Sequence, residues 1–191
     1  EVAPVLSAQD AAVLVDMLRG ADAQGFDPGE FAPGDLEARL VSPDPVARDA
    51  ARARLTTLAV AYARAQHGQR VSDFPNNWAI RPARYDAAAD FAAALAQHRL
   101  AQWAASLPPP DPRYAALVGI YARYRDIAAH GGWEAVPKGP SLKLGANGER
   151  VTALRRRLAA EDPAVVVPAV GAGASDVYDQ GLAEAVADRA V

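Results

Sequence analysis

The side chains best suited to bind a metal or transfer a proton are three histidines, His67, His98 and His130. They lie 31 and 32 residues apart on separate segments, whereas helix-borne metal sites pair two histidines four residues apart. His130 stands at a predicted helix end, one turn after Asp126. An imidazolium there would complement the helix dipole and pair with that carboxylate. We therefore predict a structural cap at His130, and we expect neither a metal site nor a cofactor.

Four aromatic residues offer a second kind of chemistry. Tyr114, Tyr121, Tyr124 and Trp133 could line a groove in which aromatic faces stack on sugar rings. The tyrosines, however, recur at helical spacing on an apolar stripe, which is typical of a row buried in a core. We expect core packing and keep sugar stacking as the alternative.

Few of these residues could serve covalent catalysis or bind a cofactor. There are no cysteines, which excludes disulfides, thiolate zinc sites and a cysteine nucleophile here. The Gly171–Gly173 stretch lacks the third glycine of a dinucleotide-binding fingerprint, so a turn is predicted. Arg155–Arg157 reach different faces of a helix and are expected to be solvated. The carboxylates are plentiful, but sequence alone assigns no pair at the separation that glycoside hydrolysis needs.

A loop is the remaining place for an enzyme site. Residues 68–84 lose the helical period and contain two prolines, which predicts an ordered loop anchored by Phe74 and Trp78. The polar residues beside Trp78 that could serve a hydrolytic site are Asp73, Asn76 and Asn77. Because no nucleophile and base pair occurs among them, this enzyme hypothesis is the weakest one.

The composition is typical of a folded chain and predicts no broad cationic surface. The 191 residues have a net charge of -3 and a pI near 5.6, so nucleic acid is a poor candidate partner. The apolar content of 51% is mostly Ala and Val, with charges interspersed between them. No apolar stretch is long enough for a membrane span.

The elements that position these side chains are predicted to be helices. Ser7 and Asp10 form a capping box that opens a helix ending near Gly25. Three Asp-Pro pairs each place an acceptor at an N-cap and a proline in the first turn, and so predict helix starts at Asp27-Pro28, Asp44-Pro45 and Asp111-Pro112. The second of these helices runs to Gln66, and the third runs to His130, with Gly131 at its left-handed end.

Helical periodicity continues through the rest of the chain. It resumes from 85 to 107 with a break near His98, and again from Gly148 and from Tyr178. Residues 165–170 could form a short strand, but one strand without a partner makes no sheet. We therefore predict an all-α fold.

Several motifs occur in a fixed order along the chain. They are Tyr121-x-x-Tyr124-Arg125-Asp126-Ile127-Ala128, Gly131-Gly132-Trp133, Pro137-x-Gly139-Pro140-x-Leu142-Lys143-x-Gly145 and Arg150-Val151-x-x-Leu154-Arg155-x-Arg157-Leu158, with Gln24-Gly25-Phe26-Asp27-Pro28 and Phe31 upstream. This ordered set resembles the large periplasmic murein L,D-transpeptidases that carry a helical scaffold domain and a peptidoglycan-binding-like domain. The resemblance runs through about residues 10 to 186.

The resemblance implies two domains, a helical scaffold domain at 1–140 and a partial three-helix peptidoglycan-binding-like domain at 141–191. It implies a periplasmic location, with peptidoglycan and the catalytic transpeptidase domain of a parent chain as partners. That parent would form 3→3 cross-links between stem peptides through a cysteine acyl-enzyme, so no catalytic residue is expected here. The candidate ligand or interdomain contacts are Trp133, Tyr121, Tyr124, Arg125 and Lys143.

The sequence also departs from the family pattern. After Ala185-Val186 the family would continue to Phe-Gln, whereas Arg189 and Ala190 stand here, and no third helix of the small module follows. The transpeptidase motif with its histidine and cysteine has no counterpart in these residues. A stand-alone envelope interaction or structural protein without transpeptidase activity is therefore the alternative hypothesis.

Overall fold

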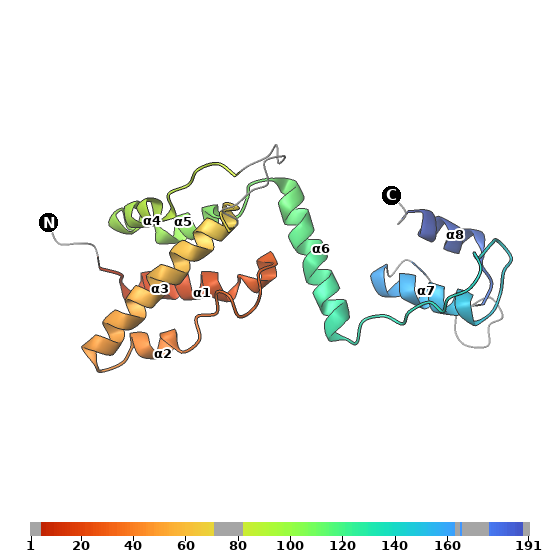
Figure 1. Cartoon of the computed structure of the whole chain (residues 1–191), viewed down its shortest axis with the longest axis horizontal. Helices are drawn as coiled ribbons and strands as arrows, with labels where there is room; N and C mark the ends of the chain where they lie inside the picture. The colour runs from red at the N-terminus through yellow and green to blue at the C-terminus, as the bar shows by residue number, and fades with distance from the viewer. Residues whose placement is uncertain (1–4, 71–81, 163–164, 166–175, 189–191) are drawn as a thin grey trace. The chain divides into compact units, whose positions relative to one another are not determined.

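The computed structural model of the chain describes residues 5–70, 82–162, 165 and 176–188. Across this part of the chain, regular structure consists of eight α-helices and a short 3₁₀ helix, with no strand (Figure 1). The all-α prediction is confirmed. Most of the strand considered at 165–170 lies outside the described residues. The other predicted features outside the described residues are Asp73, Phe74, Asn76, Asn77, Trp78, Gly171–Gly173, Arg189 and Ala190.

The chain forms two compact units, Glu1–Gly119 and Ile120–Val191. The boundary falls inside α6 (Pro112–Ala129), so each unit contributes part of that helix. The predicted boundary after residue 140, where a peptidoglycan-binding-like module would begin, stays a prediction.

The first unit is a bundle built around α1 (Ala8–Arg19), α3 (Pro45–Gln66) and α5 (Leu100–Ser106). Helix α1 packs against both α3 and α5, α2 (Leu36–Leu40) packs on α1 and α3, and α4 (Ala87–Ala96) packs on α3 and α5 (Figure 1). The largest side chains at its centre are Trp103, Leu14, Leu18, Leu55 and Leu100. Burying each leucine stabilises the fold by about 2 kcal/mol.

Helix starts in this unit follow the predicted caps. Ser7 and Asp10 form the reciprocal capping box of α1. Asp44 accepts a hydrogen bond from the Val46 N–H at 3.0 Å and places Pro45 in the first turn of α3. Such caps contribute about 1 kcal/mol each.

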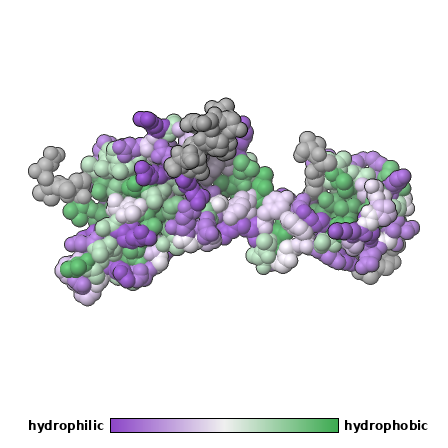
Figure 2. Space-filling model, viewed as in Figure 1, coloured by the Kyte–Doolittle hydropathy of each residue, from purple (hydrophilic) through white to green (hydrophobic). Residues whose placement is uncertain are grey.

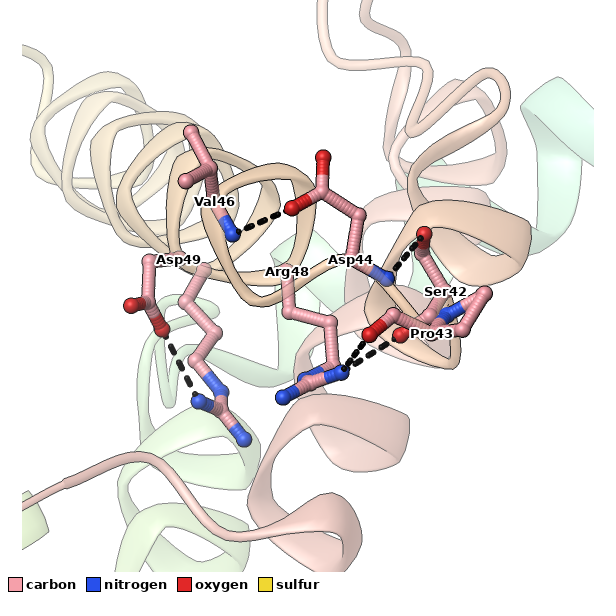
Figure 3. A network of polar contacts seen from close by, with 7 residues as sticks. Ser42, Pro43, Asp44, Val46, Arg48 and Asp49 are labelled. Carbon is pink, nitrogen blue, oxygen red and sulfur yellow. Dashed lines mark hydrogen bonds and ion pairs between the residues drawn. The ribbon is translucent and has the colours of Figure 1, made fainter.

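Arg48 reinforces the corner before α3 (Figure 3). Its guanidinium donates to the carbonyl oxygens of Ser42 and Pro43 at 2.7 and 3.0 Å, and the Asp44 N–H donates to the Ser42 hydroxyl. Orphan carbonyls at the corner are thereby satisfied, which holds the turn between α2 and α3.

The helix start predicted at Asp27-Pro28 is wrong, because the chain forms a turn there. A short 3₁₀ helix, Asp22–Gln24, ends at Gly25, whose φ is 88°. The Asp27 carboxylate then accepts the Gly29 N–H at 2.9 Å. Phe26 and Phe31 pack edge-on against Tyr62 of α3 and against one another.

The predicted break at His98 is confirmed. His98 has a φ of 53° and separates α4 from α5. Across the break, the Asp90 carboxylate accepts the Trp103 indole N–H at 2.9 Å and the Tyr85 hydroxyl at 2.8 Å. One acidic side chain thus ties the two helices and the segment before them together.

The second unit has a small core formed by α7 (Glu149–Glu161) and α8 (Gln180–Ala187). Val151, Leu158 and Leu182 form its buried apolar cluster, and Ala153 of α7 is buried as well. The backbone of 145–148 pairs with that of 176–178, including the antiparallel bridge between Asn147 and Val177. Over the described ranges, no helix is long and apolar enough to span a bilayer.

Helix α6 differs from the other long helices because none of its residues is buried. Leu117 is 63% exposed, and Tyr121 and Tyr124 are 38% and 40% exposed. The expectation that this stripe packs into a core is wrong, because helical spacing predicts an apolar face but not what covers it. Figure 2 shows other apolar residues reaching the surface between polar ones.

Candidate interaction site

The connector, residues 130–148, begins where α6 ends. Gly131 and Gly132 both have positive φ, 98° and 72°, and the Gly132 N–H donates to the Ile127 carbonyl at 2.8 Å. This satisfies a carbonyl at the helix end, as predicted for a glycine cap. The His130 Nδ1 lies 2.9 Å from the Asp126 carbonyl and 3.4 Å from its carboxylate, which confirms the predicted cap.

Trp133 follows the two glycines and packs between the second half of α6 and α7. Its ring meets Tyr124 in a T-shaped contact with centroids 5.7 Å apart. The Arg157 guanidinium lies 3.5 Å from the Trp133 centroid, and it also binds the Glu161 carboxylate on its own helix. A stacked guanidinium contributes about 1 kcal/mol at a half-exposed site. Trp133 therefore fixes the path by which the chain leaves α6.

Arg150, in the first turn of α7, holds the middle of the connector. It donates from Nε to the Pro137 carbonyl at 2.9 Å and from Nη1 to the Pro140 carbonyl at 2.8 Å. Between these carbonyls, a Cβ added at Gly139 would lie 2.7 Å from the guanidinium. Arg150 therefore fixes the conformation of the Pro-x-Gly-Pro loop, which packs around its guanidinium.

The end of the connector joins the small core. Leu142 packs against that core, whereas Lys143 is exposed. The Gly145 N–H donates to the Tyr178 carbonyl at 2.9 Å, and the Tyr178 N–H donates to the Ala146 carbonyl at 2.7 Å. The connector is thus held at its start, middle and end by contacts within the second unit.

Each arginine of the run at 155–157 has a different environment. Arg155 is buried and donates to the Val177 carbonyl and to the Asp179 carboxylate, both at 2.9 Å. Arg156 is exposed and lies 3.7 Å from the Glu134 carboxylate. The prediction of different helix faces is confirmed, but the expectation that all three are solvated is wrong for Arg155. The side chain of Arg155 fills space between α7 and the start of α8.

Asp179 caps α8 and carries a perturbed pKa. Its carboxylate accepts the Leu182 N–H at 2.8 Å. That backbone hydrogen bond, and then the Arg155 guanidinium, hold the pKa of Asp179 below its usual value. The charged form of Asp179 is therefore the one that stabilises the second unit.

The predicted contact residues divide into two groups. Tyr121 and Arg125 contact one another, with the guanidinium 5.7 Å from the ring centroid, on the same face of α6 as Tyr124. Lys143 is exposed on the connector, and the cation–π contacts of Tyr121 and Trp133 come from Arg125 and Arg157. We define the aromatic–arginine cluster as Tyr121, Tyr124, Arg125, Trp133, Arg156 and Arg157.

Two members of this cluster were missed by sequence reasoning. The sequence presents Arg156 and Arg157 only as part of a charge run, and no local pattern pairs Arg157 with a tryptophan 24 residues earlier. The one available signal was the position of Arg157 in the motif that carried the resemblance.

The start of α6 is anchored in the first unit. The Tyr114 hydroxyl lies 2.9 Å from Gln24 Oε1 and 3.2 Å from Gln66 Oε1, while Gln66 Nε2 donates to the Tyr62 hydroxyl at 2.6 Å. Burial is the main cause that raises the pKa of Tyr62. This polar network keeps Tyr114 half-buried, whereas Tyr121 and Tyr124 of the same helix are exposed.

His67, another of the three histidines, makes a structural contact with Tyr85. His67 stacks on Tyr85 with centroids 3.6 Å apart. Burial, together with the hydrogen bond to Asp90, raises the pKa of Tyr85 to about 12. Tyr85 therefore stays neutral and serves to hold the segment before α4 on the bundle.

A protein-family model described as Scaffold domain matches residues 4–119. The matched range covers the helical bundle and the start of α6, and it ends at the same residue as the first unit. No curated protein and no solved structure was found to match the chain.

Proposed function

The chain belongs to the Scaffold domain family, and from this premise we propose that it is the non-catalytic scaffold and peptidoglycan-binding-like region of an L,D-transpeptidase. The family match over the bundle is the observation that carries the proposal. In the parent enzyme, the bond-making cysteine would lie outside these residues, which contain none. The parent would form 3→3 cross-links between peptidoglycan stem peptides in the periplasm.

The physical role proposed for these residues is positioning. The bundle has an extensive buried core, and Tyr114 ties the start of α6 to it. In the second unit, Trp133 and Arg150 hold the connector against α7. Each attachment orders the chain within its own unit, which lowers the entropic cost when that unit binds a wall polymer or a catalytic domain.

Sedimentation with purified murein sacculi tests wall binding. We expect the full chain to sediment with sacculi, and Trp133→Ala to reduce the bound fraction because the connector loses its aromatic anchor. Val46→Ala changes an exposed side chain of the bundle and should bind like the unaltered chain. Absence of the unaltered chain from the sacculus pellet would overturn the wall-binding part of the proposal.

The coding sequence beyond residue 191 tests the parent enzyme. We expect it to encode a transpeptidase domain with the Ser-x-Gly-Cys-x-Arg motif. A stop codon directly after Val191 would instead support the alternative, a stand-alone envelope protein that lacks transpeptidase activity.

A further inference from the structure

We infer that the first unit binds a carboxylate carried by a small apolar group, in a pocket between α2 and α3. The pocket has a volume of about 350 Å³. This volume is at the small end of the range of about 300–1,000 Å³ that is usual for small-molecule sites. The inference goes beyond the proposed function and does not depend on it, because the pocket lies wholly within the bundle.

The inner lining of the pocket is apolar. Leu36 of α2 and Ala51 and Leu58 of α3 line it and are buried. The turn before α2 adds Ala32 and Pro33 to the lining. None of these side chains can donate or accept a hydrogen bond, so the part of a ligand that fits against them is apolar.

The charged side chains that line the pocket are exposed to solvent. They are Asp35 at the start of α2, Arg39 within α2 and Arg54 of α3. The Asp35 carboxylate accepts a hydrogen bond from Arg39 Nε at 2.7 Å, so these two charges match one another. The three side chains together have a charge of +1, and the unmatched charge is that of Arg54.

Arg54 has no carboxylate within reach on its own helix. The residues three and four positions away from it are uncharged, namely Ala50, Ala51, Thr57 and Leu58. Among the residues that the structure describes, no ion pair, hydrogen bond or ring contact involves the Arg54 guanidinium. A guanidinium with free N–H groups can bind a carboxylate through two parallel hydrogen bonds. Arg54 is therefore available to an anionic ligand.

The apolar lining and the unmatched guanidinium together define the class of ligand. A multiply charged anion such as inorganic phosphate would gain nothing from the apolar lining and would be repelled by the Asp35 carboxylate. A single carboxylate on a small apolar group can bind Arg54 and fill the space beside Leu36 and Leu58. Two sources carry this chemistry, a free short carboxylic acid and the carboxyl terminus of a peptide that ends in a small apolar residue.

Titrations of the full chain, followed by the NMR signals of its backbone amides, test the inference. The probes are propionate, the acetylated dipeptide acetyl-Ala-Ala, and the same dipeptide with its carboxyl terminus converted to an amide. We expect propionate and the dipeptide acid to shift the signals of residues 32–39 and 50–58. The dipeptide amide should bind about tenfold more weakly than the acid, because charge-assisted hydrogen bonds are lost. Tighter binding of the dipeptide acid than of propionate would assign the site to a peptide terminus, and the reverse order would assign it to a free acid.

Arg54→Gln and Arg64→Gln are the matched variants. Both remove one positive charge from an exposed position of α3, but Arg64 does not line the pocket. Arg54→Gln should lose about tenfold in affinity for the dipeptide acid, and Arg64→Gln should lose less than about twofold. Ala50→Leu leaves the charges unchanged but places a larger side chain in the lining, and should weaken binding about threefold. Circular dichroism of each variant checks that the helices are retained.

Several results would overturn the inference. They are equal affinities for the acid and the amide of the dipeptide, equal losses in Arg54→Gln and Arg64→Gln, unchanged binding by Ala50→Leu, and no shift of the lining amides with any probe. Equally tight binding of inorganic phosphate would show a general anion site and would also overturn it. None of these results would affect the proposed function, which the sacculi and the coding sequence test separately.

Discussion

The two units reach stability by different means. The first unit buries an extensive apolar core beneath five helices, whereas the second buries a small apolar cluster and relies on arginines that bind carbonyls, a carboxylate and an aromatic ring. Apolar burial tolerates changes at the surface, but hydrogen bonds from a single guanidinium fail together when that group is removed. In the first unit, we therefore expect truncation of a buried apolar side chain to cause the largest loss of stability. In the second unit, we expect removal of an arginine to cause it.

The largest effect is expected from Leu55→Ala in α3. Leu55 is fully buried, so its truncation should lower the free energy of unfolding of the first unit by about 3 kcal/mol. Residue-resolved hydrogen exchange measures this loss in α1, α3 and α5. Val46→Ala on the same helix is the control, because Val46 is 74% exposed. An equal loss of protection in α7 and α8 would contradict the separation of the units.

Arg155→Met is the corresponding change in the second unit. It keeps the side-chain length but removes the bonds to Val177 and Asp179. Because the Asp179 side chain is half exposed and stays hydrated, we expect a loss of about 2 kcal/mol rather than the larger cost of stranding a fully buried charge. Hydrogen exchange in α7 and α8 measures it. Arg156→Met, at an exposed position, should change protection little, and equal effects of the two would refute the role given to Arg155.

The same contrast explains what the sequence could predict. Helix starts at Ser7, Asp44 and Asp111 were correct because an N-cap is a local device in which a side chain bonds a backbone N–H two or three residues away. Asp27-Pro28 shows the limit of this signal. Asp27 does accept the Gly29 N–H, as a cap would, but the chain turns instead of continuing as a helix. The following Gly29, Pro33 and Gly34 are poor helix formers, and a capping pattern does not weigh them.

The candidate site was predictable only in part, for the same reason. Tyr121, Tyr124, Arg125 and Trp133 were named from their motif, but their exposure depends on whether another element covers α6. The burial of Arg155 and the stacking of its neighbour Arg157 depend on α8 and the connector. Three adjacent arginines look alike in sequence and become different only through tertiary contacts.

Two glycine substitutions are expected to have smaller effects, of opposite sign, on the free energy of unfolding. In Gly139→Ala the new Cβ would displace the Arg150 guanidinium from two carbonyls and lower the stability of the second unit by about 1 kcal/mol. Gly119→Ala meets no atom within 4 Å inside exposed helix α6, so helix propensity should raise stability by about 1 kcal/mol. Thermal unfolding should show a lower melting temperature for Gly139→Ala and a higher one for Gly119→Ala than for the unaltered chain. A stabilising Gly139→Ala would refute the arginine clamp.

The smallest effect is a pH dependence confined to the second unit. The folded pKa of Asp179 lies below its unfolded value because the Leu182 N–H and then Arg155 favour the carboxylate. Its stabilising contribution is therefore complete above the unfolded pKa near 4 and is lost as the pH falls through the folded value. Asp179→Asn keeps an N-cap acceptor but cannot titrate. Hydrogen exchange in α7 and α8 should give a higher opening free energy for the unaltered chain than for Asp179→Asn above about pH 5. This difference should become smaller as the pH is lowered. Parallel stability curves would mean that the carboxylate is not preferentially stabilised in the folded unit.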